Sequence, residues 1–382
     1  MMKDINELRA SIDSTDGKII ELLKERMQLS RDVAEYKKEK NVPVFDGARE
    51  RALLDKIEDL AGEEYGGYAR RLYITMLELS RAYQNKLLEP QSSLSKEVMR
   101  SIETTPKMFP ERVFVACQGV EGAYSQQACD KLFKKPSIMY CTTFESVFQT
   151  VKNGLCKYGI VPVENSNAGT VNLIYELMAK YDMTIVKSTN LQVLHSLLGN
   201  TTDLSKIKEI FSHPQAIAQC SDFLGSHKDI KVTPVDNTAV AAKMVRDSRR
   251  DDIAAIASPS CVEQYGMKTI AESIQNNENN RTRFICFSKE LEIYPGADKT
   301  SLLLRIPHKP GSLYQIISYF NALGLNLLKL ESRPIAGRDF EFMFYFDVGV
   351  SVYSPELLLL LDHLEYSLGR DRVQYLGSYL EA

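Results

Sequence analysis

The chain has 382 residues, of which 44% are hydrophobic and 25% are charged, and its formal net charge is -3. This length exceeds what one hydrophobic core usually supports, so two or three domains are expected. The near-balanced charge leaves no electrostatic footprint for nucleic acid or for an anionic membrane surface, and acidic ligands would therefore need local clusters of Arg and Lys.

The remaining composition is typical of a protein from a reducing compartment. The sequence contains no apolar run that approaches the roughly 18 to 20 residues of a membrane-spanning helix. Its N-terminus leads directly into an amphipathic pattern without the apolar core of a signal peptide. Seven cysteines and five histidines are scattered without the spacing of a disulfide framework or a zinc site. We expect a cytoplasmic protein with no metal and no cofactor.

The first 88 residues carry almost no strand signal, and their apolar residues recur at helical spacing. Asp46 stands where it can N-cap a helix. Three helices with one very long member cannot close a compact core alone, so this all-α module predicts a dimer whose chains share a core. The predicted elements are a long helix that ends at 41–43, a second helix through about residue 60, a turn at 62–67 and a third helix over about 68–88.

The period changes after a polar, Ser- and Pro-containing stretch at 89–110, which reads as a linker whose interior could extend a helix. From Arg112, short β-branched runs alternate with helical stretches, which predicts a mainly parallel sheet flanked by helices. About 180 residues of this pattern are long for one sheet, so two α/β lobes with a cleft between them are predicted.

The last segment follows the order βαββαβ, which is the ferredoxin-like pattern. The predicted domains are therefore residues 1–88, the linker 89–110, residues 111–290 and residues 298–382. The elements predicted in the last domain are Ser301–Ile306, Leu313–Leu323, Leu325–Glu331, Phe340–Val348, Pro355–Leu368 and Val373–Tyr379.

Cationic side chains gather on one face of the long N-terminal helix. Arg26 and Lys37 are eleven residues apart, which is three turns and roughly 16 Å, so both can reach one small anion. Arg9 lies about 100° around the helix from Arg26, so it would more easily serve the site of a second chain. Taken singly, each of these residues would more often be an exposed charge. Further polar residues at the ends of the other helices are Asp46, Arg49, Glu50, Ser80 and Gln84.

Four stretches in order, LRxxID (8–13), ERMQLSRDVAEYK (25–37), VPVFDGARE (42–50) and ELSRAYQ (78–84), resemble the all-helical chorismate mutase family. The resemblance implies a Claisen rearrangement, which needs no covalent catalyst but needs cations for two carboxylates and charge at the breaking ether oxygen. The implied roles are ether-oxygen contacts for the catalytic Lys37 and Gln84, carboxylate contacts for Arg9 of the partner subunit, Arg26, Arg49 and Ser80, and contacts to the hydroxyl side for Asp46 and Glu50.

The central segment contains four irregular motifs: GVEGAYSQQA (119–128), GIVPVENSNAGTV (159–171), SHPQAIAQC (212–220) and NNRTRFICF (279–287). Singly they are weak, because Asn-Ser pairs often only form turns and His213 before Pro214 is more often a cap or a core residue. In this order they resemble prephenate dehydratases across residues 112–290. The resemblance implies two α/β lobes like those of periplasmic binding proteins, with the site in the cleft.

Prephenate dehydration expels the ring hydroxyl as water and the ring carboxylate as CO₂, so the enzyme mainly needs help for the departing hydroxyl and clamps for carboxylates. The resemblance assigns the first task to Thr282, through hydrogen bonding, because an unperturbed threonine is a poor acid. Arg283 would clamp a carboxylate, with a structural salt bridge as the alternative. The implied substrate contacts are Ser125, Asn165, Ser166, Thr170 and Gln215, of which Ser125 lies near a helix N-terminus.

PGSLYQIISYFNALGLNLLKLESRP (310–334) resembles the ACT regulatory domain. The resemblance implies a phenylalanine site in which backbone N–H groups at a helix N-terminus meet the ligand carboxylate. A module used only for dimerisation is the alternative. The implied regulatory residues are Gly311, Ser312, Leu313, Asn326, Glu331 and Ser332.

Together the resemblances imply a bifunctional enzyme that converts chorismate to prephenate and prephenate to phenylpyruvate, with phenylalanine as inhibitor. A homo-oligomer, either dimer or tetramer, is expected. Two alternatives remain: a non-catalytic sensor of prephenate or phenylalanine, and a dehydratase whose helical module only dimerises. The intact Arg26, Lys37, Gln84 and Thr282 favour the bifunctional enzyme.

Overall fold

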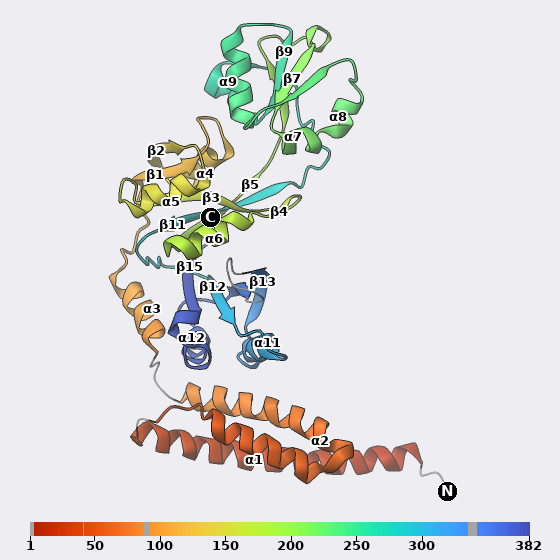
Figure 1. Ribbon diagram of the computed structural model, residues 1–382, viewed down its shortest axis with the longest axis vertical. Helices are drawn as coiled ribbons and strands as arrows, with labels where there is room; N and C mark the ends of the chain where they lie inside the picture. The colour runs from red at the N-terminus through yellow and green to blue at the C-terminus, as the bar shows by residue number, and fades with distance from the viewer. Residues whose placement is uncertain (1–3, 41, 88–91, 335–341) are drawn as a thin grey trace. The chain divides into compact units, whose positions relative to one another are not determined.

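The computed structural model describes residues 4–40, 42–87, 92–334 and 342–382 (Figure 1). The chain divides into two compact units, one of residues 1–100 with 302–374 and one of residues 101–301 with 375–382. None of the described helices has an apolar stretch long enough to cross a membrane.

The helical module contains two long helices, α1 (Ile5–Lys40) and α2 (Gly47–Lys86). Asp46 caps α2 as predicted, because its Oδ1 accepts a hydrogen bond from the Arg49 N–H at 3.0 Å. The predicted length of α1 is confirmed.

A single residue bends α2 into two limbs. Gly62 adopts φ 72° and ψ 176°, a left-handed conformation that glycine reaches without steric cost. Arg70 on the second limb contacts Asp55 at 3.0 Å and Glu58 at 2.9 Å on the first, so the limbs fold back on each other. The predicted turn over 62–67 is therefore too long, because residues 63–67 are already helical.

Most of the apolar surface of α1 is not covered within its own chain. Ser30 and Ala34 are the buried residues of this helix. The exposed large apolar side chains of α1 are Ile5, Leu8, Ile12, Ile19, Ile20, Leu22, Leu29, Val33 and Tyr36. An exposed apolar surface of this size is typical of an association face.

The C-terminal segment has the predicted βαββαβ order, and its strands form a four-stranded sheet in the order β13-β14-β12-β15. Strands β13 and β14 pair antiparallel, and Phe320 stacks on Phe346 with 5.3 Å between ring centroids. The predicted start of the third strand, Phe340, lies outside the described residues. The elements are β12 (Lys299–Ile306), α11 (Ser312–Ala322), β13 (Asn326–Pro334), β14 (Phe342–Gly349), α12 (Pro355–Leu368) and β15 (Val373–Tyr379).

The stretch predicted as a linker contains a full helix, α3 (Ser93–Thr104). Leu94 and Val98, one turn apart, are completely buried. The backbone N–H groups of Ser93 and Leu94 donate to the carboxylate of Glu365 in α12, at 3.1 and 2.8 Å. Helical structure inside this stretch was considered as a possible extension, but its buried apolar face was not predicted, because the serine-rich composition masked it.

The second unit contains two α/β lobes, as predicted (Figure 1). The first lobe has a sheet in the order β2-β1-β3-β11-β5, with β4 paired to β3. The second has a sheet in the order β10-β6-β9-β7-β8. The elements of the first lobe are β1 (Arg112–Gln118), α4 (Tyr124–Leu132), β2 (Lys135–Cys141), α5 (Phe144–Lys152), β3 (Tyr158–Asn165), β4 (Gly169–Thr170), α6 (Asn172–Tyr181), β5 (Thr184–Gln192) and β11 (Arg281–Ser288).

The second lobe is built on β9 and its neighbours, with β7 parallel to β8 and β9, and β6 antiparallel to β9 and β10. The predicted helix at 216–224 is two short helices that meet at Cys220. The elements are β6 (Ser196–Gly199), a 3₁₀ turn (Leu204–Lys206), β7 (Glu209–Ser212), α7 (Pro214–Gln219), α8 (Ser221–Gly225), β8 (Lys231–Pro234), α9 (Thr238–Ser248), β9 (Ile253–Ala257), α10 (Cys261–Tyr265) and β10 (Lys268–Ala271).

Strand β11 determines where the first lobe places its polar residues. The chain leaves this lobe after β5, builds the second lobe, and returns as β11 between β3 and β5. Because β11 runs antiparallel to both neighbours, the prediction of a mainly parallel sheet is wrong at the centre of the lobe. The return brings Thr282 directly opposite Asn165, at the end of β3.

Candidate active sites

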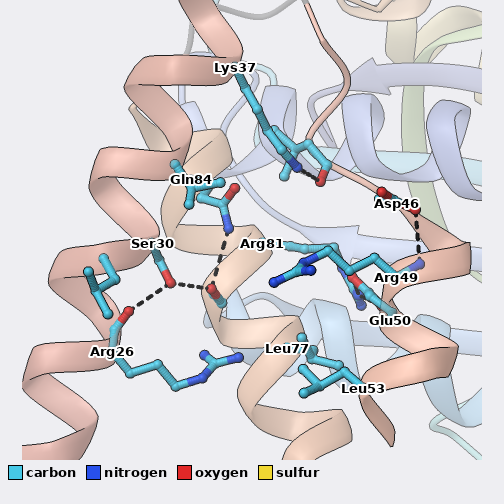
Figure 2. A pocket seen from close by; sticks show the side chains of 14 residues that line it. Arg26, Ser30, Lys37, Asp46, Arg49, Glu50, Leu53, Leu77, Arg81 and Gln84 are labelled. Atoms are coloured by element: carbon cyan, nitrogen blue, oxygen red, sulfur yellow. Dashed lines mark hydrogen bonds and ion pairs between the residues drawn. The ribbon is translucent and has the colours of Figure 1, made fainter.

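The helical module contains a pocket of about 220 Å³, lined by α1, both limbs of α2 and the segment between the two helices (Figure 2). All but one of the residues predicted for this site line it, and the exception is Arg9. The predicted residues in the pocket are Arg26, Lys37, Asp46, Arg49, Glu50, Ser80 and Gln84.

A chain of hydrogen bonds orients the Gln84 side chain. Its Nε2 donates to the Ser80 Oγ at 3.3 Å, and the Ser80 and Ser30 hydroxyls lie 2.6 Å apart. The Ser30 hydroxyl donates onward to the Arg26 carbonyl at 2.9 Å, so Ser80 must donate to Ser30. Ser30 was not predicted as a site residue from the sequence, although it stands one turn after Arg26 on the same face.

Three buried polar atoms in this pocket have no hydrogen-bond partner within the part of the chain that the structure describes: Arg26 Nη1, Arg81 Nε and Gln84 Oε1. Buried polar groups are normally paired, because leaving one unpaired costs about 1–3 kcal/mol. The unpaired atoms of Arg26 and Gln84 therefore mark positions where ligand atoms would complete the hydrogen bonding.

The pocket is electropositive. Four cations, Arg26, Lys37, Arg49 and Arg81, face two carboxylates, Asp46 and Glu50. Such a balance suits a small dianion in a partly desolvated site. Burial lowers the pKa of Lys37, although the two nearby carboxylates oppose this shift, and the Lys37 Nζ donates to the Val44 carbonyl at 2.5 Å.

Arg81 is a second pocket residue that was missed from sequence. Its Nη1 donates to both carboxylate oxygens of Glu50, at 2.5 Å to Oε1 and closer to Oε2. Arg81 lies in the sequence between Ser80 and Gln84, which could have indicated that it lines the pocket. The family resemblance gave roles to those two residues but none to Arg81.

The first α/β lobe assembles a polar group around Thr282. The Asn165 Nδ2 donates to the Thr282 Oγ1 and to the Asn280 Oδ1, both at 2.8 Å. The Asn165 Oδ1 accepts from the N–H groups of Asn167 and Ala168 at 3.1 and 2.9 Å. These two backbone donors fix the orientation of the amide, so the Thr282 oxygen accepts a bond while its proton remains free to be donated.

Hydrogen bonds of Ser166 join the two chain segments that flank this group. The Ser166 Oγ accepts from the Arg281 N–H at 2.9 Å and donates to the Asn279 carbonyl at 3.3 Å. Thr170 lies opposite Glu164 in the short β3–β4 pair. Asn280 was missed from sequence. It is buried, and its Nδ2 has no hydrogen-bond partner among the described residues.

Two other predicted residues lie on other elements. Ser125 is buried in the first turn of α4, and Gln215 is exposed in α7 of the second lobe. In the described part of the chain, no side-chain hydrogen bond joins either residue to Thr282 or Asn165. His213 caps α7 by accepting from the Gln215 N–H at 3.2 Å, which confirms its interpretation as a cap.

Arg283 follows Thr282 in β11, so the two side chains point to opposite faces of the sheet. The Arg283 Nη2 donates to the Tyr379 hydroxyl at 2.5 Å, and the guanidinium lies 5.9 Å from the centroid of that ring. This placement favours a structural role over a carboxylate clamp.

The predicted regulatory residues fall at two places in the C-terminal segment. Gly311, with φ 84°, precedes α11, which begins with Ser312 and Leu313. In β13, Glu331 is ion-paired with both Lys329 and Arg333. Asn326 and Ser332 lie on the opposite, exposed face of the same strand. Among the described residues, no cluster of His, Cys, Asp or Glu is arranged to hold a metal ion.

Comparison with known proteins assigns a family to the helical module and to the two-lobed α/β domain. The family model for chorismate mutase type II matches residues 8–85, and the model for prephenate dehydratase matches residues 115–292. The bifunctional chorismate mutase/prephenate dehydratase of Aquifex aeolicus is 30% identical over 349 residues, which cover 91% of this chain and 90% of the relative.

Solved structures resemble a large part of the chain. The prephenate dehydratase of Arthrobacter aurescens in complex with L-Phe is 27% identical, with a TM-score of 0.64, over 70% of this chain and 90% of that one. GqqA, described as a novel type of quorum quenching acylase, is 30% identical, with a TM-score of 0.64, over 70% of this chain and 98% of its own.

A cationic helical pocket and a two-lobed α/β domain on one chain define an enzyme with two centres for small anionic substrates. The chain belongs to the bifunctional chorismate mutase/prephenate dehydratase family. It rearranges chorismate to prephenate and then dehydrates and decarboxylates prephenate to phenylpyruvate, as predicted from sequence.

Proposed function

We propose that the helical pocket catalyses the rearrangement of chorismate through the residues predicted for it. The observation that carries this proposal is the convergence of Arg26, Lys37 and Gln84 on one pocket with unpaired polar atoms. Arg26 and Arg49 bind the carboxylates with support from Ser80. Lys37 and Gln84 stabilise the charge that develops on the ether oxygen, and because both are held before substrate arrives, little reorganisation is needed.

We further propose that the pocket is completed by Arg9 of the partner subunit in a homodimer. Arg9 precedes Arg26 by seventeen residues, which is about 25 Å along the helix axis, so it is too far to serve its own pocket. The uncovered apolar face of α1 supports a second copy of this helix as its cover. A tetramer would contain the same pairing twice.

The pH dependence of the mutase step tests the role of Lys37. Burial lowers the pKa of Lys37, so its positive charge is present at lower pH and is lost as pH rises through that lowered value. The kcat for chorismate should therefore fall on the alkaline side, below the pH at which an ordinary lysine titrates. Lys37→Arg should move this fall to higher pH, because arginine stays charged. An alkaline limb that is identical in both proteins would contradict the assignment.

For the dehydratase, we propose that Thr282 donates a hydrogen bond to the departing ring hydroxyl. Asn165 supports this role because its Nδ2 donates to the Thr282 Oγ1. The Thr282 hydroxyl proton is then left for donation to the substrate. As the C–O bond breaks, the electrons of the bond to the ring carboxylate move into the ring and CO₂ leaves. The departing hydroxyl takes up one proton, supplied overall by solvent, and leaves as water, so one proton is consumed in each turnover. The Asn280 Nδ2, which has no hydrogen-bond partner among the described residues, is available for a substrate oxygen. Ser125, Ser166, Thr170 and Gln215 remain proposed lining residues.

Substitution of Thr282 tests this centre. Thr282→Ala should lower phenylpyruvate formation from prephenate by about 100-fold or more, the usual contribution of a positioned proton donor. Thr282→Ser keeps the hydroxyl and should recover much of the activity. Chorismate consumption by the same proteins serves as the control and should be unchanged. Full activity of Thr282→Ala, or a serine variant as inactive as the alanine variant, would refute the role.

We propose that residues 298–382 form an ACT regulatory domain through which phenylalanine inhibits the enzyme. The order of elements and of strands supports this, as does the L-Phe bound to the Arthrobacter relative. Gly311 and the start of α11 would receive the ligand carboxylate. Residues 1–88 and 111–290 would be the two catalytic domains. The seven free, buried thiols support a reducing, cytoplasmic location.

Inhibition by phenylalanine tests the regulatory assignment. Glu331→Ala removes the carboxylate that pairs with Lys329 and Arg333, and it should raise the phenylalanine concentration for half-inhibition by about tenfold, a usual size for allosteric coupling. Activity without phenylalanine should be retained. Glu356→Ala, at the start of α12, is the matched control. Unchanged inhibition in Glu331→Ala would count against the assignment.

A further inference from the structure

Arg81 is the one cation of the helical pocket to which the proposed chemistry gives no task. It lies on the second limb of α2, and its side chain is only 13% exposed. Its guanidinium sits 5.6 Å from the centroid of the Phe45 ring, and its Nε is buried without a hydrogen-bond partner among the described residues. Figure 2 shows Arg81 reaching from this limb toward Glu50.

The pair formed by Arg81 and Glu50 ties the two limbs of α2 together at the pocket wall. Glu50 lies in the first turn of α2 and is 20% exposed, so its carboxylate is partly desolvated and depends on this partner. A single nitrogen of Arg81, Nη1, contacts both oxygens of this carboxylate, and a rigid guanidinium restricts its orientation more than the rotatable ammonium of a lysine would. A carboxylate offers about four acceptor positions, so Glu50 can bind Arg81 and still accept a bond from a ligand hydroxyl.

We propose that Arg81 is a positioning residue of the mutase site, which holds the Glu50 carboxylate where it can accept the hydroxyl of chorismate. The proposal rests on the role proposed for Glu50 and adds the group that places it. Arg81 acts through Glu50 and does not itself touch the reacting atoms. Because the hydroxyl is bound equally in the ground state and the transition state, the loss should fall on KM more than on kcat.

A double-mutant cycle in the full-length protein tests this inference. Arg81→Met and Glu50→Gln should each raise the KM for chorismate by about tenfold or more, as for loss of a hydrogen bond to a charged group. The double variant should be no worse than Glu50→Gln alone, since Arg81 has no effect once the carboxylate is gone. Arg81→Lys should recover only part of the loss, because it keeps the charge on a flexible ammonium without the rigid guanidinium.

Arg70→Met is the matched control, since Arg70 also pairs with carboxylates on α2 but does not line the pocket. Its KM should be that of the parent. Losses that multiply in the double variant would mean that Arg81 binds the substrate directly, and would overturn the inference. A normal KM in Arg81→Met beside a raised KM in Glu50→Gln would overturn it as well. A normal KM in Glu50→Gln would instead refute the role proposed for Glu50.

Discussion

The helical module depends on one constraint, the uncovered apolar face of α1. Thirty-six residues of helix meet two limbs of α2 that cannot cover them, and Ile12, Ile19 and Leu22 stay exposed. Burial of such surface contributes roughly 25 cal/mol per Å², so covering this face with a second copy would stabilise the proposed dimer. Association would also carry Arg9 into a pocket that otherwise has only the cations of its own chain. The force that assembles the proposed dimer would then also complete the site.

The polar group of the first α/β lobe depends on a different feature, the return of the chain from the second lobe to the first. Because β11 inserts between β3 and β5, residues more than a hundred positions apart meet at a hydrogen bond between Asn165 and Thr282. The reaction gains aromaticity, so the protein needs only a well-placed hydroxyl and polar contacts. In the proposed mechanism a weak donor such as Thr282 would be adequate, because its oxygen is held by an amide that two backbone N–H groups orient.

Periodicity predicted much of this fold and family resemblance much of the site, but contacts set by tertiary structure were not predictable. Helical spacing predicted α1 and the elements of residues 298–382, while the serine-rich stretch before Leu94 allowed a helix but concealed the apolar face of α3. The partner of Arg81 is 31 residues away and across a bend at Gly62, so no local pattern indicated it. Asn280 acquires its place only when β11 enters the sheet. For Arg283, strand alternation alone could have predicted that it points away from Thr282.

The most direct test of the shared mutase site is complementation between two inactive variants. Arg9→Ala and Arg26→Ala damage the same pocket from different subunits, so a mixed dimer has one doubly damaged pocket and one intact pocket. Each variant alone should lose chorismate mutase activity by about 100-fold or more. Random re-pairing after co-expression should restore about a quarter of the activity of the unsubstituted protein. A mixture no more active than its two parents would contradict the account.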